Sequence, residues 1–184
     1  MNEKNLKTNK LINLGPSGRA VSQPMDDGLM DFFYEHLTME RNANVQYFSI
    51  YLWFQERDLD GFASYFINES QGEMEHAYKF ANYFIARGQT VKLKELPAPI
   101  QTWDSIEDLI SYSFNMEADL TSSLQQLYSM AERLSDTRSN VFLDPIIEAQ
   151  TISEDEFAHI LGKVKFADKQ SSALLLIDSD LKKK

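Results

Sequence analysis

The sequence contains no cysteine. This absence excludes disulfide bonds and thiolate ligands, so any bound metal ion has to be held by carboxylate oxygens or imidazole nitrogens. Such a ligand set favours iron, manganese or zinc over the soft metals.

Positive charge is in short supply. Lys and Arg number 18 against 28 Asp and Glu, which gives a net charge of -10. This balance opposes binding to nucleic acid or to anionic lipid, and it makes the surface attractive to cations. A cationic ligand therefore suits the chain better than a polyanion.

Long apolar runs are missing as well. No stretch approaches eighteen consecutive apolar residues, and residues 1–14 lack the apolar segment of a signal peptide. We therefore expect a soluble protein without a membrane partner, in the cytoplasm, or in a plastid if the organism is eukaryotic. Residues 1–25 are expected to be an N-terminal extension that begins as a flexible tail, with the remnant of a transit sequence as the alternative.

Glycine and proline are few, at 7 and 5 of 184 residues, and the stretches between them have helical periodicity. The expected helices cover residues 26–56, 60–87, 104–135, 144–168 and, for a short apolar helix, 171–181. With 43% hydrophobic residues, the chain can bury one good core, so we expect a single domain over residues 26–184.

The ends of these helices carry recognisable signals. Asp104 and Ser105 predict the N-cap of the third helix, and Asp144 followed by Pro145 predicts a capped start for the fourth. Gly88 predicts the end of the second. The connections after the first and third helices are short, whereas the one after the second is long. The predicted fold is all-α: two antiparallel hairpins in a four-helix bundle, a long crossover between them, and a short C-terminal helix.

Three predicted helices carry core-facing stripes whose spacings alternate between four and three. The stripe of the first is Phe33, Leu37, Glu40, Asn44, Tyr47, Tyr51 and Phe54. That of the second is Phe62, Phe66, Glu69, Glu73, His76, Phe80 and Tyr83. That of the third is Ile106, Ile110, Ser113, Glu117, Leu120, Leu124, Leu127 and Leu134. In each helix a glutamate stands where a bundle core needs an apolar residue.

These carboxylates need an explanation. A carboxylate removed from water without a partner costs several kcal/mol, so protein cores tolerate one only when it is paired, hydrogen-bonded or bound to a metal ion. No Lys or Arg lies on the three stripes to neutralise the charge. Three helices with the same anomaly indicate one common cause, a metal site. A hydrogen-bonded polar network without metal is the alternative.

The carboxylates also fall at one level of the predicted bundle. Glu40 and Glu73 lie about equally far from the turn between their helices, and Glu117 and Glu154 lie about equally far from theirs. Each pair can therefore meet across its hairpin. Glu73 and His76 form a Glu-x-x-His pair on one helix face. One Glu from each of two helices, combined with such a pair, is typical of a carboxylate-bridged pair of metal ions.

The contribution of the fourth helix is open. Its stripe is Ile147, Gln150, Glu154, Phe157, Leu161 and Val164. Glu154 is then the inward carboxylate, with Asp155 and Glu156 as alternatives. Glu156 and His159 form a second Glu-x-x-His pair. At about 100° per residue His159 points away from Phe157, so this pair is expected to face solvent.

The sequence resembles the non-haem ferritins from about residue 15 to residue 181. The matching segments are MERNANVQY, EMEH, FNMEADL, DPIIEAQ and SALLLID. The resemblance implies that Glu40, Glu73 and His76 bind a first iron, that Glu73 bridges to a second iron at Glu117, and that Tyr47 is their neighbour.

The same resemblance implies a function. Ferritins oxidise Fe(II) with dioxygen and store ferric mineral inside a hollow cage of twenty-four copies. Asp144 and Glu148 then fall where three-fold channels admit Fe(II), and Glu69 where iron is relayed to the centre.

Three alternatives remain. Met74 occupies the place of the haem-ligating Met of bacterioferritins, so a haem-binding storage protein is one, although the outward angle of His159 argues against it. A passive storage shell without its own oxidation centre is the second. A small di-metal enzyme acting on an organic substrate is the third.

Overall fold

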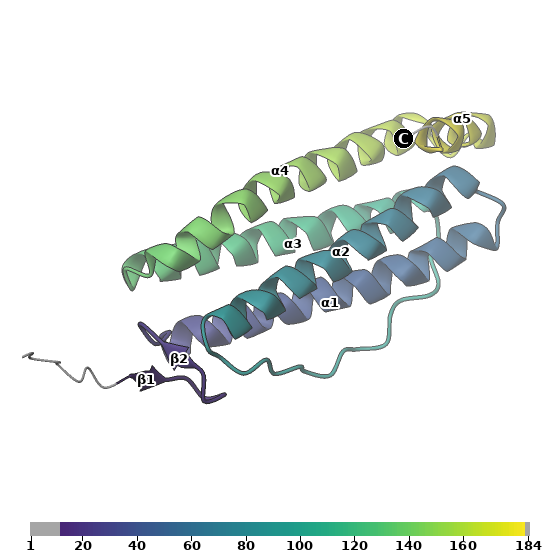
Figure 1. The fold of residues 1–184 in the computed structure, drawn as a ribbon. Helices are drawn as coiled ribbons and strands as arrows, with labels where there is room; N and C mark the ends of the chain where they lie inside the picture. Colours follow the sequence, from purple (N-terminus) through teal and green to yellow (C-terminus); the bar gives the residue numbers. More distant parts are fainter. Residues whose placement is uncertain (1–11, 183–184) are drawn as a thin grey trace, which may run out of the picture.

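The computed structural model describes residues 12–182, which form five α-helices and one small β-hairpin (Figure 1). The helices are α1 (Asp27–Gln55), α2 (Asp60–Ala86), α3 (Ile106–Arg133), α4 (Thr137–Phe166) and α5 (Ser171–Leu181), and the strands are β1 (Asn13–Leu14) and β2 (Ala20–Val21). The predicted all-α fold, a four-helix bundle with a short C-terminal helix, is confirmed. Within the described part of the chain, no helix has the length and apolar character needed to cross a membrane.

The four long helices pair as two antiparallel hairpins. α1 packs against α2, α3 packs against α4, and α1 also packs against α3. The crossover from α2 to α3 runs the length of the bundle along α1 (Figure 1). Gln46 fixes it there, because its side chain donates to the Ile100 carbonyl at 2.9 Å and accepts from the Ile100 amide at 2.8 Å.

The helix starts show one confirmed cap and one wrong prediction. Ser105 caps α3 as predicted, accepting a hydrogen bond from the Asp108 amide. The predicted start of the fourth helix at 144 is wrong: α4 begins at Thr137, and Pro145 lies inside it. Pro145 lacks an N–H and removes one helical hydrogen bond. The helix continues through it because residues on both sides, including Leu143 and Ile146, are buried in the core.

The interior divides into two hydrophobic clusters along the bundle axis. One contains Tyr47, Phe54, Phe62, Phe66 and Phe157, and the other contains Phe33, Leu37, Phe80, Phe84 and Leu127. Aromatic side chains fill the space between α2 and α4 in both clusters, as Tyr65 with Phe157 and Phe80 with Phe142. The boundary between the clusters falls at the level of Glu40 on α1 and Glu73 on α2. The polar residues predicted from the sequence therefore form a layer between two apolar halves.

Helix α5 is tied to the start of α2. The Phe62 amide donates to Asp178 Oδ1 at 2.9 Å, which supplies the cap that Leu59, the N-cap residue of α2, does not provide. Gly61 allows this approach, because a Cβ there would lie 1.7 Å from the Asp178 carbonyl oxygen. At the opposite end, the β-hairpin packs on the start of the crossover, where the Ser17 hydroxyl donates to the Gly88 carbonyl at 3.2 Å.

Candidate metal centre

Glu40, Glu73 and His76 converge between α1 and α2. One ligand atom from each lies within 4.8 Å of the other two. His76 Nδ1 is 3.2 Å from Glu73 Oε2 and 3.5 Å from Glu40 Oε2. Both glutamates are buried, whereas the His76 side chain is 25% exposed. Among the described residues, Glu40 Oε2 has no hydrogen-bond partner, although it is buried. A carboxylate oxygen of this kind is a candidate ligand for a hard cation.

The two glutamates differ in their proton affinity. Burial alone would raise the pKa of Glu40, but interactions with Glu73, His36 and His76 lower it below its usual range. Burial and the nearby Glu40 raise the pKa of Glu73. His76 lies between the two carboxylates, and its hydrogen bonds with Glu40 and Glu73 raise its pKa to about 10.

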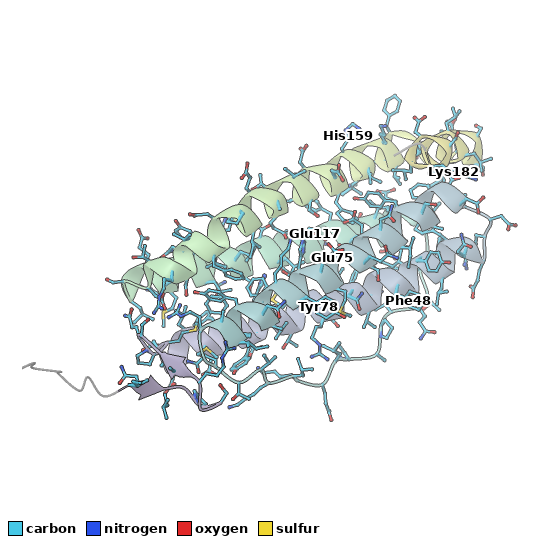
Figure 2. The ribbon with its side chains drawn as sticks, in the orientation of Figure 1. Phe48, Glu75, Tyr78, Glu117, His159 and Lys182 are labelled. Carbon is cyan, nitrogen blue, oxygen red and sulfur yellow. The ribbon has the colours of Figure 1, made fainter. Side chains whose placement is uncertain are left out.

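Glu117 approaches from α3 and is held by donors. Tyr47 Oη donates to its Oε1, while Gln150 Nε2 and the Ser153 hydroxyl donate to Oε2 at 2.7 and 3.1 Å. The side chain is fully buried within the bundle (Figure 2), and burial raises its pKa. Its charge also raises the pKa of Glu73, so the two carboxylates belong to one electrostatic site.

The residues predicted for the fourth helix are placed differently. Gln150 and Ser153 contact Glu117, whereas Glu154 is half-buried and accepts a hydrogen bond from Thr121 at 2.8 Å. Neither Glu117 nor Glu154 is part of the group formed by Glu40, Glu73 and His76. The residues of α4 that contact Glu117 are an amide, Gln150, and a hydroxyl, Ser153, and the role of Glu154 as a ligand stays a prediction.

The remaining predicted residues surround the centre without joining it. Asp155 and His159 are exposed, and His159 lies on the outer side of α4 as predicted (Figure 2). The half-buried residues are Glu69, Met74 and Glu156. Asp144 and Glu148 are exposed on the surface of α4. Asp144 is not the helix cap predicted from the sequence, because α4 begins at Thr137 and Asp144 lies inside the helix.

His36 was missed by the sequence patterns. It is fully buried on α1, with Nε2 2.8 Å from Glu40 Oε1. Its position one turn before Glu40 was a usable signal, because residues four apart share a helix face. The role of Gln150 was also missed, although it lay on the predicted stripe. Residue type misled there, because a neutral amide on a stripe is not a candidate metal ligand in the way that a carboxylate or an imidazole is.

The negative charge of the buried glutamates at the middle of the bundle has few positive partners. Among the described residues, the ion pairs of Glu40 and Glu73 are with His36 and His76, and neither has an Arg or Lys partner. A protonated His76 offsets one of the three buried carboxylates at this level, Glu40, Glu73 and Glu117. A divalent or trivalent cation would supply the missing positive charge.

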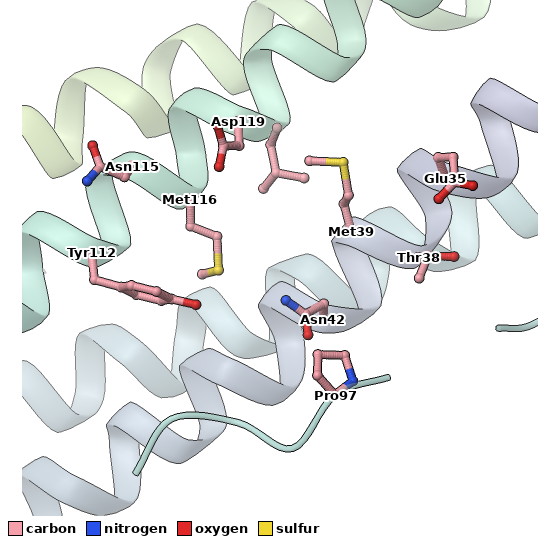
Figure 3. A pocket seen from close by; sticks show the side chains of 10 residues that line it. Glu35, Thr38, Met39, Asn42, Pro97, Tyr112, Asn115, Met116 and Asp119 are labelled. Atoms are coloured by element: carbon pink, nitrogen blue, oxygen red, sulfur yellow. The ribbon is translucent and has the colours of Figure 1, made fainter. Parts of the chain in front are cut away.

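Two hollows flank the layer. One, of about 200 Å³, opens beside His76 between α2 and α4, with Lys79, Pro145 and Ala149 in its wall. The other, of about 330 Å³, lies between α1, α3 and the crossover, where Met39 and Met116 face each other (Figure 3). The first hollow reaches a residue of the centre. The second is lined by neighbours of Glu40 and Glu117 in sequence, not by those glutamates themselves.

The fold and the side chains at its centre define a four-helix bundle with a carboxylate and imidazole candidate site for metal ions. The ferritin-like domain family matches residues 31–167, more than half of the chain. The chain therefore belongs to the ferritin family.

Individual relatives agree with this assignment. A bacterial non-heme ferritin of Bacteroides fragilis is 26% identical over 157 residues, which are 85% of this chain and 98% of that protein. An open pore ferritin from the archaeon Archaeoglobus fulgidus has the same fold, with a TM-score of 0.85, 23% identity, and coverage of 88% of this chain and 99% of that one. A PmFTN variant soaked in iron has a TM-score of 0.79 and 31% identity over 83% of this chain and 99% of that one.

Proposed function

We propose that this protein stores iron and oxidises Fe(II) with dioxygen at a di-iron centre in the middle of each subunit. The observation that carries the proposal is the buried layer of three glutamates and a histidine, in which Glu40 Oε2 has no partner. Family membership supports the choice of iron among the metals that such ligands accept.

The residues divide between two iron positions. Glu40 and His76 bind the first Fe(II), Glu73 lies between the two ions and bridges them, and Glu117 binds the second. Tyr47, Gln150 and Ser153 orient Glu117 through its two oxygens. Because burial raises the pKa of Tyr47, its hydroxyl stays protonated and acts as a donor.

The chemistry needs little from the protein beyond the ligands. Each Fe(II) gives up one electron, and dioxygen accepts the pair with two protons to form hydrogen peroxide. Carboxylate oxygens are hard ligands that favour Fe(III) over Fe(II), so they assist this transfer. The Fe(III) ions then leave for a ferric mineral in the cage, and the centre binds Fe(II) again.

The mineral needs a container, and the subunit surface is suited to assembly. Large apolar side chains are exposed on two separate faces: Phe48, Leu52 and Ile100 beside the crossover (Phe48 in Figure 2), and Leu175 and Leu176 on α5. Such residues are normally covered in soluble proteins when they gather. We infer a homo-oligomeric cage of twenty-four copies located in the cytoplasm.

Iron also needs a route into the cage. Asp144 and Glu148 are exposed one turn apart on α4, as residues lining an acidic channel would be. Glu69 lies one turn before Glu73 on α2, where it would relay Fe(II) to the centre. The weakly exposed Met74 is not needed in this scheme, which involves no haem.

The test is stopped-flow oxidation of Fe(II), added at two ions per subunit to aerobic metal-free protein. Glu73→Ala should lose the rapid phase by more than about a hundredfold, because the bridging ligand is gone. Glu75→Ala is the matched control, since Glu75 is exposed on the same helix (Figure 2). Both variants should keep the wild-type size on gel filtration.

Three other results would each favour a different function. Slow oxidation that is equal in the wild type and in Glu73→Ala would mean a passive shell. A monomer or dimer on gel filtration would exclude the cage and favour a di-metal enzyme. A haem absorption band after growth with iron and haem would favour a bacterioferritin-type protein.

A further inference from the structure

His36 is enclosed by three helices. It lies on α1, its Nδ1 is 2.9 Å from the Ser123 hydroxyl on α3, and its ring lies 4.7 Å from that of Phe80 on α2. Its side chain is fully buried. Close packing on every side leaves the imidazole no room to turn away from Glu40.

The hydrogen bond between this ring and Glu40 has a defined direction. An ionised carboxylate only accepts, so the proton between His36 and Glu40 belongs to Nε2 of the imidazole. The other nitrogen, Nδ1, forms a hydrogen bond of 2.9 Å with the Ser123 hydroxyl, which can act as donor or acceptor. Ser123 and Glu40 therefore hold the imidazole from opposite sides of the ring.

The two oxygens of Glu40 consequently differ. Oε1 is engaged by His36 at 2.8 Å. Oε2 has no hydrogen-bond partner and lies 3.5 Å from His76 Nδ1, on the side of the proposed iron position. Only one of the two oxygens is available to a metal ion without breaking a buried hydrogen bond.

We propose that His36 is a positioning residue that restricts Glu40 to a single coordinating oxygen. The inference deepens the proposed function and rests on it. With Oε1 engaged, Glu40 does not chelate the first ion with both oxygens, and one coordination position remains open for dioxygen. His36 acts through Glu40 and touches neither iron nor dioxygen.

The experiment compares two nearly isosteric replacements in the full-length protein. His36→Gln keeps an N–H that reaches Glu40, whereas His36→Met fills similar space without a donor. Anaerobic Co(II) serves as the probe, because its visible absorption weakens as its coordination number rises. Fe(II) oxidation is measured by stopped flow on the same samples.

His36→Met should weaken the absorption of bound Co(II) and slow Fe(II) oxidation by at least about tenfold. His36→Gln should retain the wild-type spectrum and most of the rate. Ser123→Ala, which leaves the ring in place without its support, should shift the spectrum in the same direction as His36→Met but less. His159→Leu controls for removal of an exposed histidine and should change nothing.

A wild-type Co(II) spectrum in His36→Met would overturn the inference, and so would equal losses in His36→Met and His36→Gln. If His36→Met does not fold, as judged by circular dichroism, the Ser123→Ala spectrum decides: an unchanged spectrum overturns the inference. Failure of the proposed function is distinguishable, because the wild-type protein would then bind Co(II) no differently from Glu73→Ala.

Discussion

The bundle contains two buried polar clusters that solve the same electrostatic problem differently. Near one end, Arg87 of the segment after α2 pairs with Asp136 at the start of α4 through two hydrogen bonds of 3.0 and 2.7 Å. Tyr83 and Ser139 also contact the guanidinium, at 2.7 and 3.3 Å, and only its Nε lacks a partner. At mid-bundle, Glu40, Glu73 and Glu117 are buried, and no Arg or Lys of residues 12–182 pairs with them.

The difference indicates a structural role for the Arg87–Asp136 cluster and a ligand-binding role for the glutamate cluster. A buried Arg and Asp that satisfy each other have no need of a ligand, and they link α2 to the turn between α3 and α4. A carboxylate cluster with a deficit of positive charge is stable only through raised pKa values or through a bound cation. The second cluster is therefore where a metal ion should bind, and the first is where removal of a partner should cost folding stability.

The largest expected effect on stability is at the paired cluster. Arg87→Ala should lower the free energy of unfolding by about 3 kcal/mol, because Asp136 is left buried without its partner. Chemical denaturation of the metal-free protein measures this loss. Co(II) affinity at the centre should be unchanged, and a large loss of affinity would mean that the two clusters are not independent.

A smaller effect of opposite sign is expected at the unpaired cluster. Glu73→Gln should make the metal-free protein more stable by about 1 kcal/mol, since it removes a buried group that repels Glu40. Zn(II) at a hundred times its dissociation constant should stabilise the wild type by about 2.7 kcal/mol and the variant hardly at all. Destabilisation of the metal-free variant would contradict the claim of an uncompensated charge.

The pH dependence of stability should also separate the clusters. Burial opposes ionisation of Asp136, but Arg87 lowers its pKa below the usual value of an aspartate. A lowered folded-state pKa stabilises the protein above the unfolded-state value of about 3.9, and this contribution is lost as the pH falls below it. The stability gap between wild type and Asp136→Asn should therefore shrink below about pH 4. A constant gap from pH 6 to pH 3 would contradict the assignment.

A similarly small effect on stability is expected at Tyr47. Tyr47→Phe removes one donor to Glu117, but Gln150 and Ser153 still hold the other oxygen. We expect a cost of about 1 kcal/mol in stability and an Fe(II) oxidation rate a few times slower. Complete loss of the rapid phase would show that Tyr47 does more than orient Glu117.

The sequence predicted most of the fold because the helices are long and strongly periodic. Ser105 and the short connections are local signals, and the structure confirms them. The start of α4 was predicted wrongly because Pro145 is a strong local signal against a helix interior. Burial of Leu143 and Ile146 overrides it, and burial depends on partners from other helices.

The candidate site was predictable where ionisable residues occupy positions that normally hold apolar core residues. Glu40, Glu73 and His76 lie on apolar stripes, and the structure brings them together. Gln150 was missed because its importance comes from Glu117 on another helix, and a neutral amide does not indicate in the sequence what it will contact across the bundle. His36 was missed although it stands one turn before Glu40 on the same helix, where its contact with that carboxylate was predictable.

The most direct test of the account is anomalous diffraction at the iron edge from crystals soaked anaerobically with Fe(II). Two iron peaks are expected in each subunit, one among Glu40, Glu73 and His76, and the other between Glu73 and Glu117. Iron peaks confined to surface carboxylates, with none at the level of Glu73, would contradict it.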